Sequence, residues 1–258
     1  MKAKSMMRVG TCAFAAALLL SGCMTPVRVK DVQADPSAYL SQHFAPDQLP
    51  AQVRKTISDT DTGPLGFQRM VLHLSWTVDE DDKNKTVRLE ETKTLINAGG
   101  SLVESLSENS RNGVPIGQFY QLSYRNLVWL RAQSMNLAAS IAPMQRQVKS
   151  FGHFDTVIAN PGTRQLDYEF EFGTSAQLMN FLNGRTTCAR GDNYPASQLF
   201  ASFAGEAQNI ECSDYNSNGV LQNKFRYVYL QHYGVAIATH SELASGISDA
   251  KIDSVTIQ

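Results

Sequence analysis

The segment LDYEFEF, residues 166–172, is the clearest strand signal in this sequence. Large apolar side chains alternate strictly with carboxylates along it: Leu166, Tyr168, Phe170 and Phe172 against Asp167, Glu169 and Glu171. A period of two is typical of a strand with one buried and one solvated face. The segment therefore predicts a sheet that covers an apolar core on one side.

Similar segments lie on both sides of it along the chain. Alternating or β-branched stretches predict strands at residues 70–78, 86–96, 102–108, 119–124, 127–134, 206–213, 220–230, 233–240 and 252–257. Short turn signals separate several of them, at Asn112-Gly113, Arg125-Asn126, Asn218-Gly219 and Gln231-His232. We predict a mainly β fold with a minor α component, as an antiparallel sheet or an open or half β-barrel with a few short helices.

Helical signals are few and short. Residues 24–66 are polar and punctuated by prolines, and we interpret them as a tether over 24–35, one or two helices over 36–57, and a loop over 58–66. Two further helices are expected within 135–149, where Pro143 interrupts the pattern, and over 176–182. Residues 67–258 are expected to form a single β-rich domain.

The N-terminus has the pattern of an export signal. Lys2, Lys4 and Arg8 precede an apolar run over 11–20, which is far short of the roughly 20 residues needed to span a bilayer. The run closes on Leu20-Ser21-Gly22-Cys23, which resembles the lipobox of bacterial lipoproteins.

That resemblance implies how the chain is processed and where it is located. Residues 1–22 would be a signal peptide cleaved between Gly22 and Cys23, and Cys23 would carry acyl chains that hold the protein on a membrane. Residues 23–66 would then hold the lipidated cysteine, the tether and the short helical segment. Met24 stands where an Asp would favour the inner membrane, so we expect an anchor in the outer membrane, facing the periplasm.

Two further cysteines remain after the leader and the anchor, Cys188 and Cys212. Two thiols in an oxidising envelope compartment are expected to pair. Closing their loop of 24 positions would contribute about 3.5 kcal/mol in the chain-entropy model. The alternative, a pair of metal ligands, lacks a histidine at useful spacing.

Charge and motifs argue against several functional classes. The chain has 23 basic and 24 acidic residues and no basic run, so it has no electrostatic footprint for nucleic acid. The acids at Asp59, Asp61 and 79–82 lack the glycine and distal Glu of a calcium loop. The five histidines are scattered, and His240 with Glu242 is the closest approach to a catalytic pair. We therefore predict no metal, no cofactor and no catalytic residues.

Aromatic residues supply the candidate binding face. Phe225, Tyr227 and Tyr229 alternate on one expected strand, with Tyr233 following, and could share one concave face with Tyr168, Phe170 and Phe172. Such a face either fills the core or lines a cleft for an acyl chain or an apolar partner segment.

Taken together, these features favour a lipid-anchored envelope protein that acts by non-catalytic binding of a protein partner, as an accessory, assembly or immunity-type factor. The alternative is a carrier of lipid or lipoprotein acyl chains in the aromatic-lined cleft. A third hypothesis, an envelope hydrolase, requires His240 or His153 to meet a serine and a carboxylate in a cleft.

Overall fold

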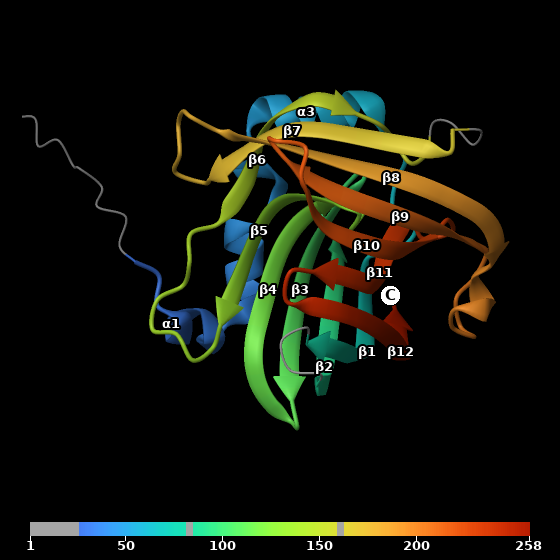
Figure 1. Ribbon diagram of the computed structural model, residues 1–258, viewed down its shortest axis with the longest axis horizontal. Helices are drawn as coiled ribbons and strands as arrows, with labels where there is room; N and C mark the ends of the chain where they lie inside the picture. The colour runs from blue at the N-terminus through green and yellow to red at the C-terminus, as the bar shows by residue number, and fades with distance from the viewer. Residues whose placement is uncertain (1–25, 81–84, 159–162) are drawn as a thin grey trace, which may run out of the picture.

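The computed structural model, which describes residues 26–80, 85–158 and 163–258, is an antiparallel β-barrel with short helices on its side (Figure 1). Each strand is hydrogen-bonded to its neighbours in sequence, and β1 pairs with β12, so the ring is continuous. This confirms the predicted mainly β, antiparallel class. The strands are β1 (Arg69–Glu80), β2 (Lys85–Asn97), β3 (Leu102–Arg111), β4 (Val114–Tyr124), β5 (Val128–Asn136), β6 (Arg146–Phe154), β7 (Gln165–Thr174), β8 (Leu182–Pro195), β9 (Glu206–Asn216), β10 (Leu221–Leu230), β11 (Val235–Leu243) and β12 (Gly246–Ile257).

Tight turns set the register where the sequence predicts them. Asn112 and Gly113 have φ values of 53° and 74°, and Arg125 and Asn126 have 50° and 54°. Two consecutive residues with positive φ match the right-handed twist of the flanking strands, which is why such turns join antiparallel neighbours closely. Arg125 is unusual in this role, since it has no intrinsic preference for positive φ.

Both helices predicted after residue 67 are wrong. Residues 135–149 contain the end of β5, a loop and the start of β6, with Met135 and Val148 buried. Residues 176–181 lie in the turn between β7 and β8, and Leu182 begins β8. The Gln177 side chain accepts from the Thr174 N–H and donates to the carbonyls of Met179 and Asn180. These bonds replace the backbone bonds of a helix.

The N-terminal helices pack on the barrel. They are α1 (Val29–Ala34), α2 (Pro36–His43), the 3-10 turn η1 (Pro46–Gln48) and α3 (Ala51–Thr60); a second 3-10 turn, η2 (Ala196–Gln198), follows β8. The expected helices over 36–57 are present, but the expected tether includes α1, whose Val29 and Val32 are buried. The boundary at residue 66 therefore divides helices from strands in the sequence, but the helices and the strands share one hydrophobic cluster.

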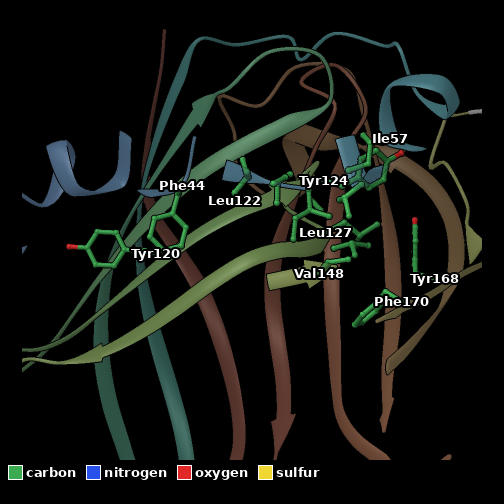
Figure 2. Close-up of a cluster of buried hydrophobic side chains, with 14 of the residues drawn as sticks. Phe44, Ile57, Tyr120, Leu122, Tyr124, Leu127, Val148, Tyr168 and Phe170 are labelled. Atoms are coloured by element: carbon green, nitrogen blue, oxygen red, sulfur yellow. The ribbon is translucent and has the colours of Figure 1, made fainter. Parts of the chain in front are cut away.

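The larger hydrophobic cluster joins these helices to the sheet. Phe44, which directly follows α2, stacks on Tyr120 of β4 with ring centroids 5.8 Å apart, and Ile57 of α3 joins the same cluster (Figure 2). A second cluster is built on Met70, Leu72 and Leu74 of β1 and on residues of β10 and β11. Burial of these apolar surfaces is the main favourable contribution to folding.

The connections that follow even-numbered strands all lie at one end of the barrel, because neighbouring strands run antiparallel and in sequence order. We call it the capped end, since residues 61–66 cross it. There the Gly66 N–H donates to Tyr233 O, and the Arg125 N–H donates to Ser101 O. Arg125 lies in the turn between β4 and β5, so this contact ties two turns together.

Candidate functional site

Most of the predicted aromatic face lies in the core. Tyr168, Phe170 and Tyr229 are buried in the larger cluster, and Phe172 and Tyr227 pack against it half-buried. Tyr233 belongs to the second cluster, and Phe225 is half-buried beside Tyr227, with ring centroids 5.9 Å apart. The sequence therefore placed six of these seven residues correctly on strands. The structure uses most of them as core packing rather than as the lining of an open cleft.

A groove of about 830 Å³ lies over β6, β7, β8 and the turn between β9 and β10. Its acidic lining, Glu169 and Glu171, comes from the carboxylate-bearing face of the LDYEFEF strand, and β6, β8 and β9 supply further polar residues. Glu169 and Glu171 pair in register with Arg185 and Asn183 of β8, and Tyr215 of β9 continues the row from Arg185. Sequence reasoning treated this face as an ordinary solvated surface.

Two glycines, Gly152 and Gly184, shape part of the groove. Gly152 and Gly184 both line it and leave space where side chains would project. At Gly184 a Cβ would come within 2.8 Å of the Phe170 ring, so this position requires the close approach that glycine permits. At Gly152 a Cβ would fit, because its nearest neighbouring atom would be 3.8 Å away. The space at this position is therefore present because residue 152 has no side chain.

Carboxylates dominate the charge in the groove. Arg185 donates to Asp167 at 3.0 Å and lies 3.9 Å from Glu169, while Ser150 Oγ donates to Glu171 at 2.8 Å. These groups are accessible to water, so their pairing contributes little to stability. They remain able to exchange partners with a cationic or hydrogen-bonding ligand.

The histidines do not form a hydrolase site with the groove. His240 Nδ1 lies 2.7 Å from Asp249, and its Nε2 lies 3.6 Å from Glu242. His153 lies 3.0 Å from Asp155. Across the ranges that the structure describes, neither ring has a hydroxyl among its hydrogen-bond partners, so the nucleophile and base are not brought together.

A second, smaller hollow of about 340 Å³ lies on β12, β1, β2 and β3. It brings together His73, Ser75 and Asp253, which sequence spacing did not single out. The Ser75 hydroxyl donates to Asp253, and His73 pairs with the hydroxyl of Thr92 at 3.1 Å. His73 and Ser75 therefore have different hydrogen-bond partners. The histidine is not hydrogen-bonded to the serine hydroxyl, as the general base of a serine nucleophile would be.

The acidic residues that were considered as calcium ligands in the sequence have other roles in the structure. Asp61 forms a bidentate, fully buried ion pair with Arg125, at 2.6 Å and 2.8 Å, and Asp59 pairs with Lys55 on α3. The run 79–82 lies partly outside the described residues. Among those that are described, no group of three or more His, Cys, Asp or Glu is arranged to hold a metal ion.

Burial opposes ionisation of Asp61, but hydrogen bonds from Arg125 and Tyr124 outweigh it, so the pKa of Asp61 lies below its ordinary value. Arg125 Nη1 and Nη2 also donate to Gly234 O and Gly63 O. This pair holds the capped end together. Both carboxylate oxygens of Asp61 and all three guanidinium nitrogens of Arg125 have hydrogen-bond partners within the protein, so we interpret the pair as structural.

The predicted disulfide is confirmed. Cys188 and Cys212 face each other in register on β8 and β9, with Cα atoms 4.0 Å apart and the sulfurs bonded. The lipobox residues Gly22 and Cys23 lie outside the described residues. Among the described residues, none of the helices combines the length and the hydropathy of a transmembrane segment.

Comparisons with known proteins add one structural likeness. No family model matches this chain, and no curated protein matches it. A crystal structure from Brucella abortus, described as a beta-barrel-like protein of the domain of unknown function DUF1849, is similar with a TM-score of 0.42 and 8% sequence identity. The match covers 76% of this chain and 100% of that one.

Proposed function

We propose that this protein is a lipid-anchored envelope lipoprotein that binds a protein partner without catalysis, through the groove over β6–β9. The observation that carries the proposal is the groove itself: about 830 Å³ of space on a sheet that a disulfide and a packed core hold in place. A site of this size accommodates a short peptide segment or a loop.

The lining indicates the chemistry of the partner. Glu169 and Glu171 present carboxylates that one guanidinium, Arg185, only partly neutralises, while Phe151 and Tyr215, both half-buried, offer aromatic surface. A segment that combines a basic side chain with an apolar one satisfies both features. We infer an envelope protein with such an exposed segment as the partner.

The anchor supports a binding role. Acyl chains on Cys23 would fix the domain at a membrane outside the cytoplasm, where a binder meets its partner at high local concentration. On the lipobox resemblance we place the anchor in the outer membrane, facing the periplasm.

Site-specific crosslinking of the native lipidated protein in its own envelope tests the binding role. A photoreactive side chain at Asn183, in the groove, is expected to capture one stoichiometric protein partner, whereas the same group at Asn109 on β3 is not. The pair Glu169→Gln and Glu171→Gln should reduce the yield several-fold. Equal capture at both positions, or co-purified lipid with no crosslinked protein, would overturn the proposal.

A further inference from the structure

The end of the barrel opposite the capped end carries the N-terminus. It is formed by the connections that follow odd-numbered strands. The chain enters the described structure there: Ala142 N–H, between β5 and β6, donates to Val27 O at 2.9 Å, and Val29 N–H donates to Ser140 O at 3.2 Å. In Figure 1 the β5–β6 connection, the β7–β8 turn and α1 all lie at the left of the molecule.

Exposed large apolar side chains concentrate at this end, which we call the apolar end. Ile158, beside the capped end, is the single exception among the described residues. The others lie in or next to the connections after odd-numbered strands, or beside them at the N-terminus: Val27, Val114, Ile116, Ile141, Met144, Leu178, Met179, Leu182, Val220, Leu221, Leu243 and Ile247. Scattered apolar residues are normal on a protein surface, but a concentration at one end marks an interaction site.

The β7–β8 turn is built to present its apolar residues. Leu178 is 86% exposed and Met179 is 69% exposed, although the Gln177 side chain bonds three backbone groups of the same turn. Ser175 N–H donates to Gln145 O at 2.9 Å, which ties the turn to the loop that holds Met144. The exposure therefore belongs to an ordered turn joined to the N-terminal region.

We propose that the apolar end rests against the phospholipid bilayer that holds the Cys23 acyl chains, with Leu178, Met179 and their neighbours in the interface. Cys23 precedes Val27 by four positions. Four extended residues reach at most about 14 Å, so the acyl chains enter the bilayer close to the apolar end. This inference rests on the proposed lipid anchor and adds a second point of attachment and a fixed orientation.

Tryptophan quenching by brominated lipid tests this orientation in the full lipidated protein, reconstituted in phosphatidylethanolamine and phosphatidylglycerol vesicles. The variants are Leu178→Trp at the apolar end and Ile158→Trp, an exposed apolar residue near the capped end, as the matched control. Relative to the parent signal of Trp76 and Trp129, Leu178→Trp is expected to be quenched several-fold more strongly than Ile158→Trp. Equal quenching overturns the orientation.

Mass spectrometry of the same sample separates this inference from the proposed function. Acylated Cys23 with equal quenching leaves the anchor in place and removes the orientation. An unacylated Cys23 removes both. Quenching at Leu178→Trp that requires native envelope proteins and is absent in pure vesicles assigns the apolar end to a protein partner and overturns the bilayer contact. Near-UV circular dichroism checks that each variant keeps the parent fold.

Discussion

At the scale of single residues, the Asp61–Arg125 pair links segments that are far apart in sequence. Besides Asp61, Arg125 contacts Gly63 and Gly234, and a Cβ at Gly234 would come within 2.6 Å of its Nη1. Tyr124 donates to Asp61 at 2.7 Å and accepts from the Val157 N–H, which brings the β6–β7 connection into the same network. One guanidinium thus organises several turns of the capped end.

Arg125→Met is expected to lower the free energy of unfolding by about 3–5 kcal/mol, because it leaves the Asp61 carboxylate buried without its partner. Chemical denaturation at neutral pH measures the loss. Lys55→Met, in an exposed ion pair with Asp59, is the matched control and should change stability by less than about 1 kcal/mol. A similar effect of both variants would contradict a structural role for the buried pair.

The lowered pKa of Asp61 also predicts that the protein loses stability at acidic pH. The pKa of Asp61 is lower in the folded protein than its ordinary value of 3.8, so the stability it contributes is present above that value and is lost as the pH falls through the lower folded pKa. Acid titration followed by circular dichroism should show unfolding shifted to higher pH in Tyr124→Phe, which removes one hydrogen bond to the carboxylate. An unchanged acid transition would argue that Tyr124 does not stabilise ionised Asp61.

Glu104 on β3 predicts the opposite dependence. Burial raises the pKa of its carboxyl from 4.5 to about 7. A carboxyl with a raised folded pKa stabilises the fold while protonated, and this contribution is lost as the pH rises from about 4.5 to about 7. Glu104→Gln should therefore flatten the pH dependence of the unfolding free energy over that range. A parallel curve for parent and variant would contradict this.

At the scale of elements, the disulfide stabilises β8, whose residues have a weak intrinsic preference for the strand conformation. β8 contains Asn, Gly and Asp residues that are poor strand formers, and its pairing with β7 and β9 holds it in the sheet. Cys188→Ala with Cys212→Ala should lower the unfolding free energy by about 3.5 kcal/mol, since it frees a loop of 24 positions in the unfolded chain. Denaturant melts of the parent and the variant, with and without reductant, measure it; reductant should affect the parent alone.

The same strand shows why sequence patterns predicted some elements and missed others. β1, β2, β7 and β10 have alternating apolar residues and were found. β6 and β8 were missed because their pairing comes from neighbours rather than from their own composition, and tertiary context overrides local preference. The groove was missed for a related reason: Glu169, Arg185 and Tyr215 become neighbours through register alone. Asp61 and Arg125 are 64 positions apart, and no local motif joins them.

At the scale of the whole molecule, the described strands pair least extensively between β5 and β6, which we call the seam. β5 and β6 pair in register at Arg131 with Gln147 and at Ala132 with Arg146, whereas β1 and β2 pair along nearly their full lengths. Helix α3 packs against β6, one of the two strands at this junction. The N-terminal helices run from the apolar end to Asp61 at the capped end, and Gln52 of α3 donates to the Lys149 carbonyl of β6 at 2.6 Å. Helix α3 therefore supports β6, the strand that borders the groove.

This arrangement predicts where the barrel opens. Local opening has the lowest cost where few backbone bonds hold a strand, so amides of β5 and β6 should exchange with deuterium faster than those of β1 and β2. Gln52→Ala should accelerate exchange in β6 further, because it removes the bond to Lys149 O. Gln42→Ala, an exposed residue of α2, is the control and should leave β6 unchanged. Hydrogen exchange with mass spectrometry measures each segment. Protection of β6 equal to that of β1, in the parent and in Gln52→Ala, would show that the seam is not the weak point and that α3 does not brace the groove.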